Sequence, residues 1–384
     1  MGKYQQRAVV LLRVYSACNL STERMTQVPP FGKIKLLIVD DSLFFRKSLE
    51  RGLSKDSRIE IIGMAVDPFD AMEKIKQLNP DVVTLDVEMP KLNGIDFLKK
   101  LMPVHPLPVV VVSSAPVSAL DALEAGAVDF VKKPEIKSSQ DLNNFIDDLI
   151  VKIKIASTAK IPTRRVPARP AAAASVHTAP AMPALSPASQ RSNTNTVIAI
   201  GASTGGTEAI LAVIRDLPPT TPGIVIVQHM PPVFTNMYAQ RLDRICRMHV
   251  KEAENNDRVV PGQVIIGAGG LQLRLAKDAR GYYVKSEGSE KVGGFCPAVD
   301  VLFNSVAEAA GCNAMGVILT GMGADGSKGL LKMRKAGAYT IGQDQESCVV
   351  YGMPMVAFNI GAVQKQFPLD KIGGEIMRYL NTRS

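Results

Sequence analysis

Several features are scarce in this 384-residue sequence, and each scarcity excludes a class of protein or site. No run of 18 apolar residues occurs, so the sequence predicts no transmembrane helix. The five cysteines are scattered, with no CxxC pair and no zinc-like spacing, which argues against a disulfide framework or a zinc site. An odd number of scattered cysteines favours reduced thiols and a cytoplasmic location. Histidine is also rare, with four residues, which narrows the choice of a catalytic base.

The net charge of +9 could indicate a nucleic-acid-binding surface, but its distribution argues against one. Residues 1–33 contain five basic residues and one acidic residue, whereas residues 156–194 contain five basic residues and no acidic one. These two segments account for the whole excess, so the rest of the chain is neutral in aggregate. We expect no nucleic-acid partner, because a recognition surface needs charge concentrated on a folded domain.

Residues 1–33 are expected to form a disordered extension. The apolar run at 8–12 bears a weak likeness to a secretion signal, but Arg13 interrupts it, so we predict neither export nor membrane insertion. An alternative is that translation begins at Met25.

Residues 34–155 alternate short apolar runs with amphipathic segments, a pattern typical of buried parallel strands and covering helices. The predicted strands are Lys35–Val39, Glu60–Met64, Val82–Leu85, Val109–Val112 and Val128–Val131. A predicted helix follows each strand, over 42–54, 68–78, 93–102, 118–125 and 139–154. Five such units predict a doubly wound α/β domain, in which functional groups gather at the carboxyl ends of the strands.

Residues 156–194 contain six prolines, eleven alanines and few large apolar side chains, a composition that predicts a linker. A second α/β domain is predicted over 195–384. Its predicted strands cover 197–200, 224–227, 315–319 and 338–342, and its predicted helices cover 207–215, 235–245, 299–309, a segment after Asp325, and 370–381. The stretch before residue 299 is β-rich, with turns at Pro261-Gly262 and Arg280-Gly281, so we predict a sheet with a hairpin insert.

Three aspartates stand at the ends of predicted strands in the first domain. Asp40 and Asp41 end the first strand and Asp86 ends the third, so their carboxylates are expected to share one crevice. Such a concentration of negative charge favours a bound cation, and hard oxygen ligands suit Mg²⁺. Ser113 ends the fourth strand, and Lys133 follows the fifth and can pair with a phosphate. Each residue alone has an ordinary structural explanation, such as a helix cap, but the combination is specific.

These residues resemble those of a response-regulator receiver domain. The matching motifs are Val39-Asp40-Asp41-Ser42, Leu85-Asp86-Val87-Glu88-Met89-Pro90, Ser113 and Lys133-Pro134. The resemblance covers about 34–155 and implies phosphorylation of Asp86, with Mg²⁺ held mainly by Asp41 and Asp86. It also implies that Ser113 and Phe130 respond to the phosphoryl group.

The second domain begins with a glycine-rich turn, Gly201-Ala202-Ser203-Thr204-Gly205-Gly206, between a predicted strand and a predicted helix. This turn fits the G-x-S-x-G pattern that exposes a nucleophilic serine. Glycine-rich turns of this kind also bind phosphates, so a nucleotide site is an alternative. No lysine follows as in a Walker loop, and no Gly-x-Gly-x-x-Gly spacing is present.

The position of the histidines limits the partner of Ser203. His105 lies in the first domain and His177 in the linker, which leaves His229 and His249. His229 ends a predicted strand next in sequence to that of Ser203, so we favour it as the base.

Asp325 follows a third predicted strand and is the candidate acid, although a helix N-cap is its alternative role. The resulting order of serine, histidine and aspartate is one that convergent triads permit.

The second domain resembles the CheB family of chemotaxis protein-glutamate methylesterases. The matching motifs are the Ser203 turn, Gln228-His229-Met230-Pro231-Pro232, Leu319-Thr320-Gly321-Met322-Gly323-Ala324-Asp325-Gly326 and Tyr351-Gly352-Met353-Pro354. The resemblance implies Ser203 as nucleophile, His229 as base and Asp325 as orienting acid. It also implies that Thr204 and Met322 lie beside the oxyanion.

Two loops depart from the usual family pattern. Residues 266–272 carry Gln272 where a histidine is usual, and Cys296-Pro297-Ala298 replaces an Arg-Pro-Ser. The departures leave the candidate triad intact, so they put the substrate preference in doubt rather than the chemistry.

The expected function is a phosphorylation-activated serine hydrolase that demethylates glutamate methyl esters on methyl-accepting chemoreceptors and deamidates glutamines. The expected partner kinase is a CheA-like histidine kinase, and the ester hydrolysis needs no cofactor. Two alternatives are a non-catalytic receptor-binding regulator and an esterase for a small metabolite.

Overall fold

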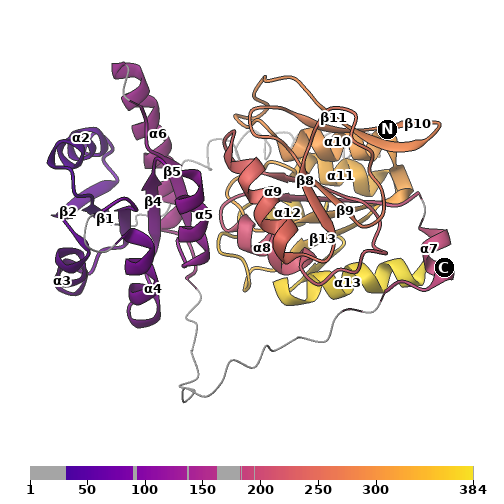
Figure 1. Ribbon diagram of the computed structural model, residues 1–384, viewed down its shortest axis with the longest axis horizontal. Helices are drawn as coiled ribbons and strands as arrows, with labels where there is room; N and C mark the ends of the chain where they lie inside the picture. Colours follow the sequence, from indigo (N-terminus) through magenta and orange to yellow (C-terminus); the bar gives the residue numbers. More distant parts are fainter. Residues whose placement is uncertain are drawn as a thin grey trace, which may run out of the picture.

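The computed structural model describes residues 32–89, 93–135, 138–161, 182, 184–193 and 195–383. They form two α/β domains that pack against each other (Figure 1). Residues 1–31 of the predicted extension lie outside the described residues, and so does the middle of the predicted linker. Among the residues that are described, no helix is long and apolar enough to cross a membrane.

The N-terminal domain is a five-stranded parallel sheet in the order β2-β1-β3-β4-β5 (Figure 1). Its strands are β1 (Ile34–Val39), β2 (Ile59–Ala65), β3 (Val82–Asp86), β4 (Val109–Ser113) and β5 (Asp129–Lys132). Its helices are α2 (Leu43–Leu53), α3 (Pro68–Leu78), α4 (Gly94–Val104), α5 (Pro116–Glu124) and α6 (Ser139–Ala156). Helices α3, α4 and α5 contribute to the core on one face of the sheet, and α2 and α6 to the core on the other. The predicted doubly wound fold is confirmed.

Local sequence explains why these elements begin where they do. Strands β3 and β4 are buried at every position, which accounts for their continuous apolar runs. Helix α3 begins at Asp67, whose side chain accepts the N–H groups of Phe69 and Asp70, and Pro68 occupies the first helical position. Because both faces of the sheet are buried, continuous apolar runs in the sequence identify its central strands.

The C-terminal domain contains a seven-stranded parallel sheet in the order β14-β13-β12-β6-β7-β9-β8. Its strands are β6 (Val197–Ala202), β7 (Ile224–Gln228), β8 (His249–Glu252), β9 (Gln263–Ile266), β12 (Ala314–Ile318), β13 (Tyr339–Gln343) and β14 (Lys365–Phe367). The main helices are α8 (Gly206–Ile214), α9 (Phe234–Ile245), α10 (Val299–Ala309), α11 (Ser327–Lys335), α12 (Met353–Asn359) and α13 (Leu369–Thr382), with a 3₁₀ turn, η1 (Gly311–Asn313). Strands β12, β6 and β7 are adjacent, so their carboxyl ends meet at one place.

The β-rich insert divides into two parts. Strands β8 and β9 pair in parallel and extend the main sheet beyond β7. The antiparallel hairpin consists of β10 (Leu273–Asp278) and β11 (Gly281–Ser286). The turn at Arg280-Gly281 thus forms the predicted hairpin, whereas Pro261-Gly262 leads into a strand of the main sheet.

Both ends of the predicted linker, 156–194, contact folded parts of the chain. At the first end, the Lys160 N–H donates to the Val349 carbonyl in the C-terminal domain (2.9 Å). At the second end lies the short helix α7 (Pro187–Ser192), and Asn193 donates to the Leu380 carbonyl (2.8 Å). Residues 184–193 therefore belong structurally to the C-terminal domain.

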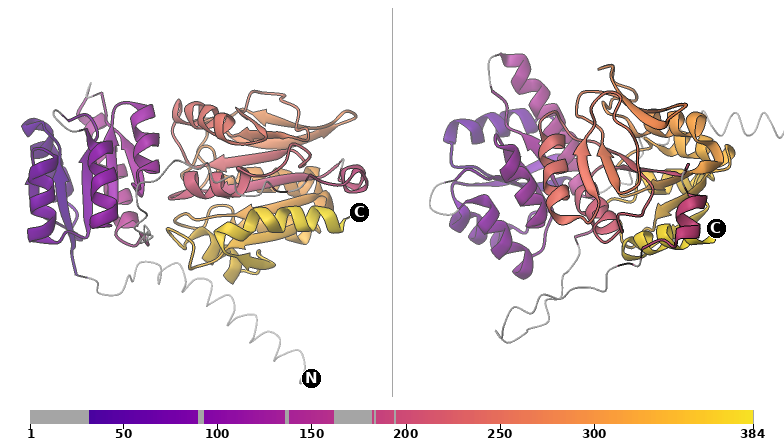
Figure 2. Two further views of the ribbon diagram at one scale, coloured as in Figure 1. Left: turned by 60° about the horizontal axis from the view of Figure 1, so that its bottom comes forward. Right: turned by 45° about the vertical axis from the view of Figure 1, so that its right-hand side comes forward.

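The two domains lie side by side (Figure 2). They meet through α5, which packs against α8 and α9. Arg241 of α9 lies at this contact, where it pairs with Glu124 of α5 (3.2 Å) and with Glu208 of α8 (3.3 Å). Phe130 of β5 stacks on Phe234 of α9, with ring centroids 4.6 Å apart. The N-terminal domain thus touches the end of the second sheet at which the Ser203 turn lies.

Candidate active site and carboxylate cluster

Ser203 lies in the tight turn between β6 and α8, as the sequence predicts. Gly205 has a φ of 75°, a left-handed conformation that favours glycine. A Cβ atom on Gly206 would lie 2.1 Å from Oε1 of Gln228, so a larger residue could not be accommodated there without a shift. The two glycines let the chain reverse closely enough to present Ser203 at the carboxyl end of the sheet.

The structure brings Ser203, His229 and Asp325 together from three adjacent strands. Nδ1 of His229 lies 3.1 Å from Oγ of Ser203, and Nε2 lies 2.7 Å from Oδ2 of Asp325. Both ring nitrogens are therefore engaged, one with a hydroxyl and one with a carboxylate. A serine, a histidine and an aspartate linked in this way have the geometry that can activate a serine as a nucleophile.

Asp325 is held by the first residues of a neighbouring helix. The N–H of Val299 donates to Oδ2 (2.7 Å) and the N–H of Asp300 donates to Oδ1 (2.9 Å), both at the start of α10. Burial raises the pKa of Asp325, but the hydrogen bond and charge of His229, with these two N–H groups, outweigh it and lower the pKa. The carboxylate is thus kept ionised beside the imidazole. The alternative role of helix cap is partly correct, but the helix that Asp325 caps is α10 rather than the α11 that follows it.

His249 occupies a different part of the domain. It lies on β8 at the edge of the sheet, and its exposed ring contacts Asp243 (2.8 Å). The structure does not bring it to Ser203, which leaves His229 as the histidine beside the serine among the described residues.

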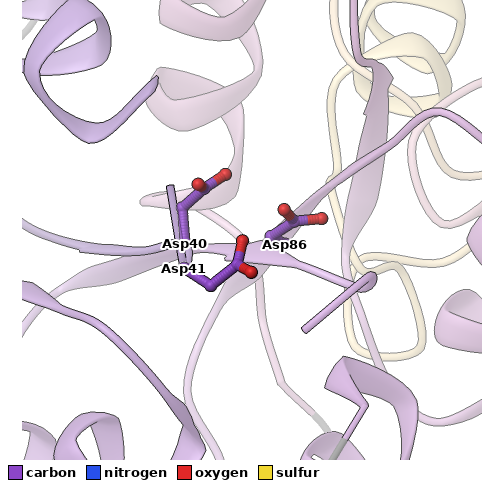
Figure 3. Close-up of side chains that lie close together, drawn as sticks. All are labelled: Asp40, Asp41 and Asp86. Atoms are coloured by element: carbon purple, nitrogen blue, oxygen red, sulfur yellow. The ribbon is translucent and has the colours of Figure 1, made fainter. Parts of the chain in front are cut away.

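The three aspartates of the N-terminal domain also come together (Figure 3). Asp40, Asp41 and Asp86 each offer a carboxylate oxygen within 4.8 Å of the others. Nζ of Lys133 lies 3.0 Å from Asp40 and 2.6 Å from Asp86. Burial and the nearby charge of Asp86 raise the pKa of Asp40 to about 6 despite Lys133.

Three carboxylates beside a single lysine give this cluster a net negative charge. A divalent cation would offset the negative charge, and the carboxylate oxygens are donors of the type that hard cations bind. The cluster can therefore hold a metal ion.

Of the other predicted residues, Ser113 lies at the end of β4, where its hydroxyl donates to the Ala115 carbonyl (3.1 Å), and Phe130 faces the C-terminal domain.

The N-terminal domain covers the Ser203 site. A cavity of about 240 Å³ lies between the domains and is lined by Ser203, His229 and Met322 from one side. From the other side it is lined by Leu123, Val128, Asp129, Phe130, Lys152 and Ile155. Access to the serine is therefore restricted in this arrangement.

Asp129 makes the most direct contact between the domains at this site. The hydroxyl of Thr204, the residue after Ser203, donates to Oδ2 of Asp129 (2.6 Å) in a buried hydrogen bond. Lys152 of α6 pairs with Oδ1 of the same carboxylate (2.7 Å). Sequence reasoning did not identify Asp129, and the one signal available was its position directly before the predicted switch residue Phe130.

Comparisons with known proteins identify the families of both domains. Residues 36–146 match the family model described as a response regulator receiver domain, and residues 198–376 match the one described as CheB methylesterase. A protein-glutamate methylesterase/protein-glutamine glutaminase of Syntrophomonas wolfei is 53% identical over 349 residues, or 91% of this chain and 98% of that protein. A protein with the same name from Syntrophotalea carbinolica is 47% identical over 355 residues, which cover 91% of this chain and 99% of that protein.

A crystal structure of the Thermotoga maritima CheB methylesterase catalytic domain is also similar, with 38% identity and a TM-score of 0.47, covering 48% of this chain and 99% of that one. The two family models occur in the predicted order, and the two relatives align over almost their full lengths. The chain therefore belongs to the CheB family of protein-glutamate methylesterases/protein-glutamine glutaminases, with a receiver domain preceding the methylesterase domain.

Proposed function

We propose that this protein hydrolyses glutamate methyl esters, and the amide groups of glutamines, on methyl-accepting chemoreceptors, and that phosphorylation of Asp86 activates it. The observation that carries the hydrolytic part is the relay from Ser203 through His229 to Asp325. The names of the aligned relatives support the two substrates.

The reaction begins with attack of Ser203 Oγ on the side-chain carbonyl carbon, while its proton passes to Nδ1 of His229. Asp325 holds the N–H at Nε2 and stabilises the imidazolium that forms. His229 then protonates the leaving group, which departs as methanol or ammonia, and the acyl-enzyme remains. Water, deprotonated by His229, attacks the acyl carbon, releases glutamate and restores Ser203.

The oxyanion is assigned to the backbone N–H groups of Thr204 and Met322. Both residues line the cavity beside Ser203, and within the described residues neither N–H donates to another group. The N–H of Ser203 itself donates to the Thr320 carbonyl (3.0 Å), so it is already occupied. Two donors aimed at the developing charge are the usual requirement for acyl transfer.

The receiver domain is proposed to inhibit the enzyme by covering this site. A receptor helix is about 10 Å across, so it cannot enter a cavity of about 240 Å³. The receptor glutamate can reach Ser203 only after the domains separate. The buried contact between Asp129 and Thr204 would have to break in that step.

Phosphorylation is proposed to favour the separated state. A phosphoryl group on Asp86 adds about −1.5 to −2 charge beside Lys133, which already contacts that carboxylate. Lys133 follows β5 closely, and Phe130 on β5 packs against Phe234 across the interface. A change at the carboxylate cluster can therefore bias the contact between the domains.

Mg²⁺ is the cation proposed for the cluster of Asp40, Asp41 and Asp86. When bound, it would neutralise charge on the phosphoryl donor. The protein groups arranged for this purpose are the three carboxylates and Lys133. The proposed donor in the cell is a CheA-like histidine kinase.

Replacing Asp86 with asparagine is expected to leave the basal esterase rate unchanged and to abolish its rise on addition of Mg²⁺ and a small-molecule phosphodonor. The amide cannot accept a phosphoryl group. The measurement is methanol release from methylated receptor with and without the donor. Asp81→Asn is the matched control, because Asp81 is exposed just before β3, at the opposite end of that strand. An Asp86→Asn variant that is activated like the native chain would contradict the assignment.

Deletion of residues 1–181 is expected to give an enzyme that is active without phosphodonor, at a rate about tenfold or more above that of the unphosphorylated chain. A closed state favoured by only about 1.4 kcal/mol would already hold nine tenths of the molecules. The deletion ends before α7 because 184–193 pack on the methylesterase domain. If the shortened protein is no faster than the unphosphorylated full chain, inhibition by the receiver must be abandoned.

A further inference from the structure

An aromatic ring lies flat against the imidazole of His229. The ring of Phe295 is nearly parallel to it, with an interplanar angle of 7° and centroids 3.8 Å apart. Phe295 also lines the cavity beside Ser203. It follows none of the strands that carry the candidate triad, and belongs instead to the loop that precedes α10.

This loop is held by one buried side chain, that of Gln272. Its Nε2 donates to the carbonyls of Glu290 (2.8 Å) and Phe295 (3.1 Å), and its Oε1 accepts the N–H of Ala298 (2.9 Å). Gln272 is 1% exposed, so water cannot replace these bonds readily. The two donors and the acceptor each face a partner of the right kind, which also fixes the orientation of the amide.

The same loop leads directly to the groups that hold Asp325. Ala298, which Gln272 anchors, precedes Val299 and Asp300, whose N–H groups bind the two oxygens of that carboxylate. One short segment therefore contacts His229 through Phe295 and Asp325 through its backbone. Its position therefore affects both the histidine and the aspartate that the histidine contacts.

We propose that Phe295 and Gln272 are positioning residues for the hydrolysis, acting through His229 and Asp325 rather than on the substrate. This inference rests on the proposed function, because it assumes that His229 is the base. The imidazole can turn about its Cβ–Cγ bond only by passing through orientations perpendicular to its present plane, and Phe295 occupies that space. The stacked ring thus keeps Nδ1 directed at Ser203 and Nε2 directed at Asp325.

The kinetic test uses the full chain, with Mg²⁺ and phosphodonor, and measures methanol release from methylated receptor. Phe295→Leu is expected to lower kcat about tenfold with KM changed less than twofold, because a small misorientation of a catalytic group is costly. Gln272→Leu is expected to lower kcat in the same way, and Phe295→Tyr to retain at least half of it, because a tyrosine ring can stack similarly. The matched control is Tyr379→Leu, which removes one ring from the stacked pair of Tyr339 and Tyr379 in the same domain and is expected to leave kcat unchanged.

If Phe295 served only as a wall of the cavity, its replacement would change KM and kcat differently. A wall that only contacts substrate would raise KM and leave kcat nearly unchanged. An unchanged kcat in Phe295→Leu, or an equal loss in Tyr379→Leu, would therefore overturn the proposal.

A second measurement does not depend on turnover. The chain has four histidines, so selective isotope labelling gives four sets of ring signals, and those of His229 are identified by their absence in His229→Gln. Ring protons facing an aromatic plane are shielded, so the His229 signals are expected to move downfield in Phe295→Leu and in Gln272→Leu, but not in Tyr379→Leu. If the signals do not move in Phe295→Leu, the stack is absent and the inference fails. If they move but Ser203→Ala remains fully active, the proposed function fails while the packing of Phe295 on His229 is upheld.

Discussion

Replacing Ser203 with alanine is expected to abolish ester hydrolysis, lowering kcat by about 10⁴-fold or more while the protein still folds and still accepts a phosphoryl group on Asp86. The hydroxyl is the atom 3.1 Å from Nδ1 of His229, and removing one member of such a relay removes nearly all of its contribution. The measurement is methanol release from methylated receptor by the phosphorylated chain.

Ser286→Ala is the matched control for the loss of a serine hydroxyl. Ser286 lies in the same domain on β11, and its buried hydroxyl has no hydrogen-bond partner in the described part of the chain. We expect this variant to retain the native rate. A Ser203→Ala variant with a tenth of native turnover would rule out Ser203 as the nucleophile.

Replacing His229 with glutamine is expected to be about as damaging as Ser203→Ala, again by about 10⁴-fold. Glutamine keeps a polar side chain but cannot take and return a proton between Ser203 and the leaving group. The double variant Ser203→Ala/His229→Gln is expected to lose little beyond either single change, because the residues act as a unit. Single-turnover assays on the same methylated receptor measure all three.

His249→Gln is the natural control for the histidine, since the ring of His249 is exposed at the sheet edge and pairs with Asp243. We expect it to be nearly silent. Inactivation by His249→Gln with a normal rate in His229→Gln would show that the base has been assigned to the wrong residue.

Much of the candidate site could be predicted because its residues follow buried parallel strands. Strands buried on both faces have continuous apolar sequences, so β3, β6, β7 and β12 are recognisable, and residues at or beyond their carboxyl ends are expected at a known edge of the sheet. Short-range features also identify the Ser203 turn, because glycine is required where the chain reverses closely. The choice of His229 over His249 needed only the strand ends and a count of histidines.

The contacts between segments distant in sequence could not be predicted in this way. Nothing local to Asp325 indicates that it receives the first N–H groups of α10, and nothing local to Thr204 indicates a bond to Asp129 some 75 residues earlier. The predicted hairpin likewise accounts for only part of the β-rich insert. The other part, β8 and β9, pairs in parallel and joins the main sheet beside β7, which is distant in sequence.

Strand burial and turn chemistry are properties of neighbouring residues, so the two α/β domains, the carboxylates Asp40, Asp41 and Asp86, and the order of Ser203, His229 and Asp325 could be predicted from the amino-acid sequence. The stacking of Phe295 on His229 and the position of the receiver over the serine are seen only in the folded molecule. These features depend on the packing of loops and domain faces, whose partners are selected by shape and by hydrogen bonds between residues far apart in the chain.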